Sequence, residues 1–393
     1  MSTLRLSGGK RLWKDDGCMQ GEDGAVAWVA LRAAAGVGDV LARRLVARFG
    51  GAEQTLAAGA SALAAAGLNS EAAATLEAGR QLEAAADEVA RIRAAGARLI
   101  PCTDSEYPSL LSVVHDAPLY LVARGEPLGD GPAVAVVGAR HATPYGKDVA
   151  MRLAEELAQA GVTVVSGLAR GVDGAAHGGA LRGGGQTVAV LGSGIDIIYP
   201  AEHRELAARI TCSGTLLCER PVGAAPRPEY FPARNRIIAG MTHGTVVVEA
   251  AGRSGSLITA RLALEGGREV FAVPGRIDSP LSVGTHRLIQ EGAKLTASVD
   301  DVLSEIVPAL RARAGVRTAV ADVASSRRPS GDGAAGSMDD ALVPLLAGGP
   351  LAIDELIRES GLSASRVLTS VLDLELRGIV VQLPGKQVQL AKR

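Results

Sequence analysis

Residues 133–146 read AVAVVGARHATPYG, and the order of residue types in this stretch decides the fold. The five apolar residues Ala133–Val137 end at a glycine, as a short buried β-strand does before a turn. Thr143 is a favoured helix cap, and Pro144 suits the first position of a helix that Gly161 can end. The stretch therefore predicts a strand, a tight turn and a helix in succession.

The same pattern repeats further along the chain. Four more short runs rich in β-branched residues are each followed by a glycine-rich or polar turn and a helical stretch: Val162–Val165, Thr187–Leu191, Thr245–Glu249 and Glu269–Val273. Such apolar runs are typical of parallel strands that are covered on both faces. Their alternation with helices predicts an α/β fold with a Rossmann-like, doubly wound parallel sheet. We expect this domain to occupy residues 97–310, with two leading strands in residues 97–130.

Two different segments precede the sheet. Residues 1–24 lack a hydrophobic period and are expected to be a disordered tail, whereas residues 25–96 are rich in Ala and Leu at helical spacing and predict a small helical domain. Within it, AGVGDVLARRLVARFGG (residues 35–51) resembles a helix-hairpin-helix of the SAM-like kind. Its Gly-Val-Gly turn could direct backbone amides at a DNA phosphate, but we favour a packing module that touches no DNA.

Two further segments follow the sheet. Residues 311–340 are rich in Arg, Ala, Ser and Gly and predict a flexible linker. Residues 341–393 show three helical stretches and two short strands around a Pro-Gly turn, which is a winged-helix pattern. The third helix could enter a major groove, but it carries Asp373 and Glu375 and few basic side chains. Docking to a protein is therefore as good an interpretation as duplex recognition.

Composition limits the kind of partner that the chain can bind. Its 393 residues have a formal net charge of -1, and aromatic residues make up 3%. A broad nucleic-acid-binding surface would be more basic and richer in aromatic side chains. A site for a polyanion must therefore be local, built from a few arginines and backbone amides.

The cysteines and the apolar runs indicate a compartment. The four cysteines form no CxxC pair and no metal-ligand spacing, which indicates thiols in a reducing environment and no metal site. The first residues are polar and charged, unlike a signal peptide, and no apolar run is long enough to span a membrane. We expect a cytoplasmic protein without a membrane partner.

The turns that follow the predicted strands are suited to an anion. In an open parallel sheet, ligands gather at the carboxyl ends of the strands, near the point where the strand order reverses. Glycines there expose backbone amides, and helix N-termini add partial positive charge. The turns after the first three strands contain Gly138, Ala139 and Arg140, then Ser166 and Gly167, then Gly192 and Gly194. None of them matches GxGxxG or GxxxxGK[ST], so we expect no nucleotide cofactor.

The densest polar cluster is FPARNR, residues 231–236. Arg234 and Arg236 can hold phosphates with forked donors. Asn235 offers an amide to a base edge or to the backbone, and Phe231 can stack on a base. The alternative is a structural helix start in which the arginines pair with Glu249 or Glu229.

A second polar cluster is RSGSLIT, residues 253–259, at a predicted strand-to-helix turn. The candidate DNA contacts here are Arg253, Ser254 and Ser256. A structural role is equally good, because Ser256 can simply cap the helix.

Ser166, Asp173 and His177 allow a catalytic interpretation, which we do not adopt as the leading one. Ser166 lies in no GxSxG elbow, and Asp173 and His177 are four residues apart on one helix face, where a local hydrogen bond is more common than a hydrolytic site. No carboxylate pair and no histidine cluster indicates a metal. We expect no catalytic residue.

These stretches together resemble the DNA-processing protein A family, DprA, also called Smf. The matching segments include VAVVGARHATPYG, VVSGLARGVDGAAHGGAL, VAVLGSGIDIIYPAEHRELA, FPARNRIIAG and GTHRLIQEGAKL, in order through the central domain. The helical domain and the winged helix match a common layout of the family. The resemblance implies a non-enzymatic protein that binds single-stranded DNA, protects incoming DNA during natural transformation, and loads the RecA recombinase.

The resemblance also implies roles for particular residues. Gly138 and Arg140 match the phosphate-binding G-S/T-R turn of the family, in which Ala139 here replaces the hydroxyl residue, while residues 234–236 match its FPxRNR segment. Arg204 is implied as a further backbone contact. The family's S-E-Y/F triplet reads CER at residues 218–220, so no role is assigned to its arginine.

A self-association region is also implied by the resemblance. Residues 285–295 correspond to it, with His286, Leu288 and Ile289 as anchors of a symmetric homodimer. The alternative is a helix buried in the core.

Two other functions compete. The first is a Rossmann-like nucleotide hydrolase related to the lysine-decarboxylase-like and phosphoribohydrolase proteins, whose PGGxGTxxE turn is echoed only partly by Gly244, Thr245 and Glu249. The second is a regulator that binds duplex DNA through its winged helix.

Overall fold

The computed structural model describes residues 22–306, 345–346, 351–360, 380–383 and 387–390, and the chain divides into two compact units, 1–316 and 317–393. Nearly all of the expected tail, the expected linker and the third helix of the winged-helix pattern lie outside the described residues. Within those residues, no helix combines the length and the apolar character needed to cross a membrane.

The centre of the first unit is a nine-stranded sheet with the order β1-β2-β6-β5-β4-β3-β7-β8-β9. The strands are β1 (Arg98–Pro101), β2 (Tyr120–Gly125), β3 (Ala133–Val137), β4 (Thr163–Ser166), β5 (Thr187–Val190), β6 (Thr215–Cys218), β7 (Gly244–Val247), β8 (Glu269–Ala272) and β9 (Lys294–Leu295). From β6 to β9 all neighbours are parallel, and β2 pairs antiparallel with both β1 and β6. The predicted doubly wound α/β fold is confirmed.

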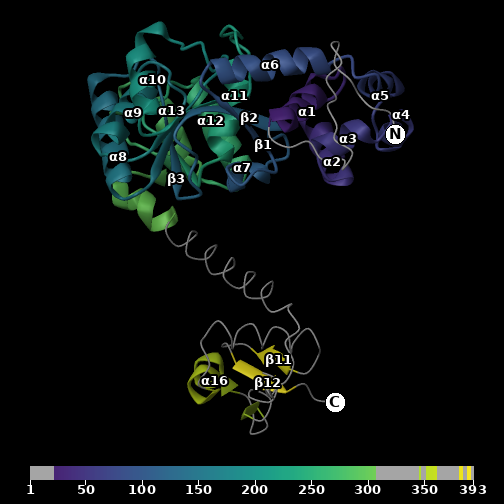
Figure 1. Ribbon diagram of the computed structural model, residues 1–393. Coiled ribbons are helices and arrows are strands. Elements are labelled where there is room, and N and C mark those ends of the chain that lie inside the picture. Colours follow the sequence, from purple (N-terminus) through teal and green to yellow (C-terminus); the bar gives the residue numbers. More distant parts are fainter. Residues whose placement is uncertain (1–21, 307–344, 347–350, 361–379, 384–386, 391–393) are drawn as a thin grey trace. The chain divides into compact units, whose positions relative to one another are not determined.

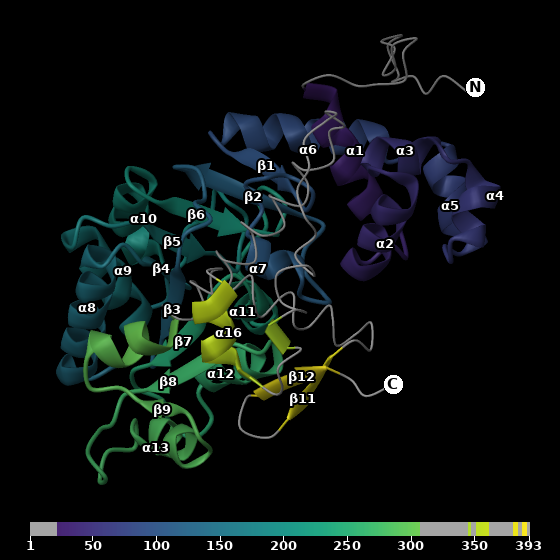
Figure 2. The ribbon, with the colours of Figure 1, turned by 90° about the horizontal axis from the view of Figure 1, so that it is seen from below.

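Helices cover both faces of this sheet (Figure 2). One face carries α8 (Pro144–Gln159), α9 (Val172–Arg182) and α10 (Arg204–Thr211), and the other carries α7 (Ser109–Ser112), α11 (Tyr230–Gly240) and α12 (Gly255–Glu265). Strand β3 shows why its sequence is apolar throughout. Val134 and Val136 belong to the core under α8 and α9, whereas Ala135 and Val137 belong to the core under α11 and α12.

The start of α8 has the predicted cap. The Thr143 hydroxyl accepts a hydrogen bond from the Gly146 amide at 3.0 Å, and Pro144 is the first helical residue. Glu249 strengthens this cap, because its carboxylate accepts from both the amide and the hydroxyl of Thr143, at 2.9 and 2.6 Å. The connection from β3 into α8 is therefore fixed at its first turn.

A bundle of short helices precedes the sheet. It contains α1 (Glu22–Ala33), α2 (Asp39–Phe49), α3 (Ala52–Ala57), α4 (Ala60–Ala65), α5 (Ser70–Glu77) and α6 (Leu82–Ala94). The first residue of α2, Asp39, accepts from the Leu119 amide at 3.1 Å, and Arg43 of the same helix donates to the Val114 carbonyl at 2.9 Å. Helix α2, which follows the Gly-Val-Gly turn, thus packs onto the residues before β2.

The second unit contains a small antiparallel sheet with the order β10-β12-β11, shown in yellow in Figure 1. Its elements are β10 (Leu351–Ala352), α16 (Ile353–Ser360), β11 (Val380–Leu383) and β12 (Gln387–Leu390). Strands β11 and β12 are the two C-terminal strands that the sequence predicts.

Candidate nucleic-acid interface

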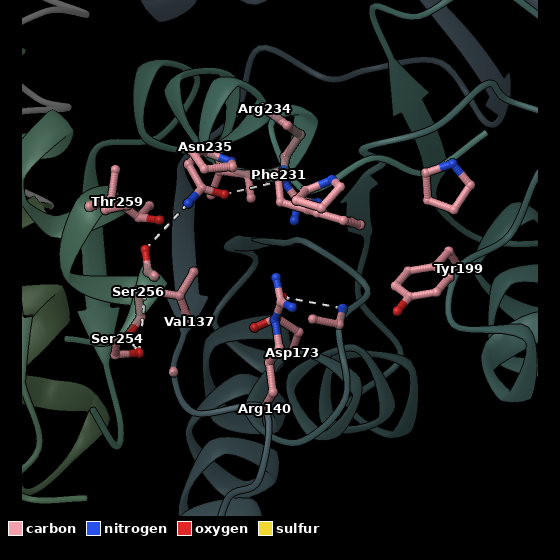
Figure 3. Close-up of a pocket in the computed structure, with 18 residues that line it drawn as sticks. Val137, Arg140, Asp173, Tyr199, Phe231, Arg234, Asn235, Ser254, Ser256 and Thr259 are labelled. Atoms are coloured by element: carbon pink, nitrogen blue, oxygen red, sulfur yellow. Dashed lines mark hydrogen bonds between the residues drawn. The ribbon is translucent and has the colours of Figure 1, made fainter. Parts of the chain in front are cut away.

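A pocket of about 680 Å³ lies at the carboxyl ends of the central strands, near β3 and its two neighbours in the sheet, β4 and β7 (Figure 3). Its walls come from the loops after β3, β4, β5 and β6 and from the first turns of α11 and α12. The lining residues are Val137, Gly138, Arg140, Ala169, Asp173, Tyr199, Pro226, Pro228, Phe231, Pro232, Arg234, Asn235, Ile238, Ser254, Gly255, Ser256, Ile258 and Thr259.

Arg140 is the exposed cation of this pocket. Its side chain reaches into the middle of the pocket (Figure 3), with the guanidinium carbon 5.2 Å from the centre of the Phe231 ring. Phe231 in turn contacts Tyr199, the two ring centres being 5.6 Å apart and the planes tilted by 42°. Among the described residues, no carboxylate lies within ion-pair distance of Arg140, although its charge also acts on the buried carboxylate of Asp173 in the same pocket. Its forked donors are therefore available to an anion, beside two aromatic faces.

The turn that carries Arg140 allows close backbone approach. A Cβ at Gly138 would lie 2.6 Å from a Val172 methyl group and 3.0 Å from the Glu249 carbonyl oxygen, so glycine is required. Ala139 is buried, and its carbonyl accepts from the Val172 amide at 3.2 Å. Gly138 and Arg140 thus line the pocket, whereas Ala139 lies behind it.

Arg234 forms the floor of the pocket and is 4% exposed. It donates to the Gly167 carbonyl at 2.8 Å and also to the Val190 carbonyl, and its Nε donates to the Asn235 side chain at 3.2 Å. Burial lowers the pKa of Arg234 to about 10, so it remains charged at neutral pH. The phosphate contact predicted for Arg234 is therefore largely wrong, because its donors are used by two carbonyls at the ends of β4 and β5. These hydrogen bonds hold the two strand ends together.

Asp173, at the start of α9, shapes the loop after β4. Its buried carboxylate accepts from the amides of Gly167 and Ala169, at 3.1 and 3.3 Å. Burial raises its pKa, and the positive charge of Arg234 opposes that rise. The Gly167 amide was predicted to be available to a phosphate, but it already donates a hydrogen bond to Asp173. An acidic residue in the first turn after a glycine-rich loop was the signal that could have identified this role.

The three residues considered for catalysis bond to different partners. Ser166 is fully buried outside the pocket lining and donates to the Val136 carbonyl at 2.7 Å. The Nδ1 atom of His177 lies 2.8 Å from the Thr187 hydroxyl. None of the hydrogen bonds described for Ser166, Asp173 and His177 joins one of them to another, so they form no catalytic chain.

Arg236 lies on α11 with Arg234 but serves a different contact. It pairs with Glu219 at 2.5 Å, with Asp116 at 3.4 Å and with Asp39 at 3.6 Å, and it does not line the pocket. The alternative considered from sequence, pairing of the arginines with Glu249 or Glu229, was wrong in its partners. The phosphate contact predicted for Arg236 would require it to leave three carboxylates.

Helix α12 presents its N-terminus to the pocket. Its cap is Ser254, which accepts from the Ser256 amide at 3.4 Å, and this corrects the expectation that Ser256 is the cap. The two hydroxyls lie 2.8 Å apart and both residues line the pocket. Arg253, directly before them, is exposed but does not line the pocket. Asn235 joins α11 to this turn by donating to the Gly255 carbonyl at 3.4 Å.

The remaining predicted contacts lie elsewhere. Arg204 is exposed at the first residue of α10, outside the pocket lining. Leu288, in α13 (Val283–Gln290), is 8% exposed and belongs to the core, and Ile289 packs partly buried against it. The ring of His286 lies 3.0 Å from the Gly275 carbonyl. For Leu288 the structure favours the buried-core alternative over a dimer anchor.

Glu249, the residue on which the hydrolase alternative depends, faces a second hollow of about 560 Å³. Both of its carboxylate oxygens are bonded to Thr143 in the cap of α8. This carboxylate therefore already has a structural role, which counts against its use as a catalytic base.

Tyr199 lines the pocket but is not among the contacts predicted from the sequence. It is 43% exposed and contacts Phe231 across the mouth of the pocket. In a chain with five tyrosines and three phenylalanines, an exposed tyrosine beside a predicted phosphate site was a usable signal.

Two family descriptions match this chain. The DNA recombination-mediator protein A family matches residues 98–307, which hold the whole sheet and the pocket. The DprA winged helix domain matches residues 327–386, in agreement with the winged-helix prediction.

Individual relatives point to the same family. Protein Smf of Escherichia coli is 40% identical over 302 residues, which is 75% of this chain and 78% of that protein. The X-ray structure of DNA processing protein A from Streptococcus pneumoniae is 36% identical with a TM-score of 0.61, covering 71% of this chain and 97% of that one. A structure of DNA processing protein A from Helicobacter pylori, described for its single-stranded DNA binding mode, is 30% identical with a TM-score of 0.47, covering 51% of this chain and 93% of that one. The family match over residues 98–307 and the relatives from Escherichia coli and Streptococcus pneumoniae show that the chain belongs to the DNA recombination-mediator protein A family, whose members are named DprA or Smf.

Proposed function

We propose that this protein binds single-stranded DNA through the pocket around Arg140, without reading its sequence. The observation that carries the proposal is the pairing of an exposed guanidinium with the Phe231 ring, beside the N-terminus of α12. A guanidinium and helix amides suit a phosphate. The aromatic faces suit a base, and every base has a face that can stack.

The shape of the pocket favours a single strand. Phe231 is half-buried, and the pocket is concave and walled by loops from both sides of the sheet. A paired base in a duplex presents only its edges, so it cannot stack on Phe231 or Tyr199 without leaving its partner. A flexible strand can turn its bases in while its phosphates stay at the rim.

Membership of the family supports a proposal about the biological role. We propose that the protein acts in the cytoplasm as a homodimer, protects incoming DNA during natural transformation, and loads RecA. We also propose that it does so without catalysis, which agrees with the structural use of Glu249 and with the separate partners of Asp173 and His177.

The test is the affinity for a labelled oligothymidine of about 15 nucleotides and for the matching duplex. We expect Arg140→Ala to weaken single-strand binding about tenfold, since a charge-assisted contact is worth roughly 1.5 kcal/mol. The matched control is Arg152→Ala, which removes an exposed arginine from α8 outside the pocket. A preference for duplex, or equal affinity of wild type and Arg140→Ala for oligothymidine, would reject the proposal.

A further inference from the structure

A second arginine, Arg170, lies at the edge of the pocket, and the binding proposed for Arg140 does not involve it. A small hollow of about 30 Å³ shares Arg140, Tyr199 and Phe231 with the main pocket, and Arg170 lines it. Arg140 and Arg170 therefore border the same continuous surface. A strand that crosses the aromatic pair can meet both guanidinium groups.

Arg170 is held by one carboxylate in a two-pronged contact. Its Nε donates to one oxygen of Glu202 at 2.8 Å, and its Nη2 donates to the other at 2.9 Å. Glu202 lies in the short turn η1 (Ala201–His203), which follows Tyr199. This fork-to-fork geometry is the one that arginine also uses to bind a phosphate.

The contact is exposed and therefore easily exchanged. The side chains of Arg170 and Glu202 are 48% and 55% exposed. An ion pair in water contributes little free energy, because solvent and salt screen it. A phosphate that offers Arg170 the same two acceptors can replace the carboxylate at small cost, and Glu202 then returns to water. Arg170 lines the same small hollow as Tyr199 and Phe231, so the released guanidinium stays beside the aromatic pair.

We propose that Arg170 is a phosphate-binding residue of this interface and that Glu202 occupies its guanidinium until a phosphate of the DNA backbone replaces it. The inference rests on the proposed function. It adds Glu202 as a residue that lowers the affinity of the protein for single-stranded DNA. Glu202 acts as an internal competitor, so the free protein does not present its full positive charge.

The experiment is a double-mutant cycle on the full chain, read as affinity for oligothymidine at low salt. We expect Glu202→Gln to tighten binding about threefold, within the range of an exposed ion pair, and Arg170→Gln to weaken it by about the same factor or more. In the double variant Arg170→Gln/Glu202→Gln, the gain from Glu202→Gln should disappear, because no guanidinium is left to release.

The matched control is Glu205→Gln. Glu205 is exposed on α10, three residues after Glu202, and no ion pair is described for it. Its replacement removes the same charge from the same region, so any general electrostatic gain appears in both variants. Because both glutamates are exposed, we expect both variants to keep the thermal unfolding temperature of the wild type. This measurement checks that the fold is intact.

The outcomes separate the two proposals. The inference is overturned if Glu202→Gln and Glu205→Gln tighten binding equally, if the gain persists without Arg170, or if Arg170→Gln binds like the wild type. In those cases a loss of affinity in Arg140→Ala would leave the proposed function standing. If neither Arg140→Ala nor Arg170→Gln changes the affinity, both proposals fail.

Discussion

At the scale of single residues, Gly167 connects the shape of the loop to the position of Arg234. A Cβ at Gly167 would lie 2.5 Å from Nη2 and 2.7 Å from Cζ of Arg234, whose guanidinium is already fixed by two carbonyls. We expect Gly167→Ala to displace Arg234 and to destabilise the protein by about 1–3 kcal/mol, as overpacking of a core does. Thermal and denaturant unfolding measure this change.

The matched control for that substitution is Gly178→Ala. Gly178 lies within α9, and a Cβ there would meet nothing within 4 Å. We expect it to stabilise the protein by roughly 0.5–1 kcal/mol, since glycine is disfavoured inside a helix. Equal destabilisation by the two alanines would contradict the role given to the contact with Arg234.

His177 should make stability depend on pH. Burial lowers its pKa from 6.5 to about 3, so the folded protein keeps the ring neutral while the unfolded chain takes up a proton. Stability from this residue is therefore complete above about pH 6.5 and is lost as the pH falls toward 3, by roughly 1.4 kcal/mol per pH unit. Between about pH 7 and pH 5 the loss is about 2 kcal/mol.

The measurement is the unfolding free energy of wild type and His177→Asn at about pH 7 and pH 5. The Thr187 hydroxyl donates to the Val164 carbonyl, so it accepts from Nδ1–H of His177, and an asparagine amide can replace that donor. We expect the variant to lose less stability on acidification than the wild type. If the unfolding free energies of wild type and His177→Asn fall by the same amount between the two pH values, His177 does not titrate in this range.

At the scale of elements, helix α11 contributes one arginine to the pocket and another to a cluster of carboxylates. Arg234 turns into the pocket, whereas Arg236 contacts Asp39 of α2 and the carboxylates of Asp116 and Glu219. We expect Arg236→Ala to destabilise the protein by about 2 kcal/mol, because Glu219 and Asp39 each lose one of their two arginine partners and keep only Arg220 and Arg32. The destabilisation should appear as faster proteolysis of residues 25–96, measured by limited digestion.

Arg44→Ala is the comparison for this substitution, because Arg44 is an exposed residue of α2 and no ion pair is described for it. Its removal should leave the digestion rate unchanged. If Arg236→Ala digests no faster than Arg44→Ala, the ion cluster does not hold the helical domain.

The elements also show how far sequence reasoning reaches. The strands that bear glycine turns were predicted, because apolar runs ending in glycine are a strong local signal. Strand β6 was missed, since Thr215–Cys218 is a short run between polar residues, and β9 has two residues and exists through its pairing with β8.

Side-chain direction was harder to predict than the position of the elements. Two residues apart on a helix means roughly 200° of rotation, so Arg234 and Arg236 must face nearly opposite ways. The sequence alone could not say which of them faces the pocket. That choice depends on Glu219 and Asp39, which only the folded chain brings to Arg236.

At the scale of the whole molecule, positive and negative charges nearly cancel. The chain has 41 basic and 42 acidic residues, and Arg236, Arg170 and Arg182 are each paired with carboxylates. Under the proposed function, attraction to DNA comes mainly from the unpaired Arg140 of the pocket and from its rim. A molecule of this kind should bind DNA with a weaker salt dependence than one with a broad basic surface.

The salt dependence can be given a size. Arg140, Arg170 and the N-terminus of α12 together can neutralise two or three phosphates, so the slope of log affinity against log salt should be about -1.4 to -2.1 for a single strand. Titration of oligothymidine at several salt concentrations measures it, and Arg140→Ala should reduce its magnitude by about 0.7. A slope steeper than about -4 would require phosphate contacts well beyond the pocket, and the site would then have to include another part of the chain.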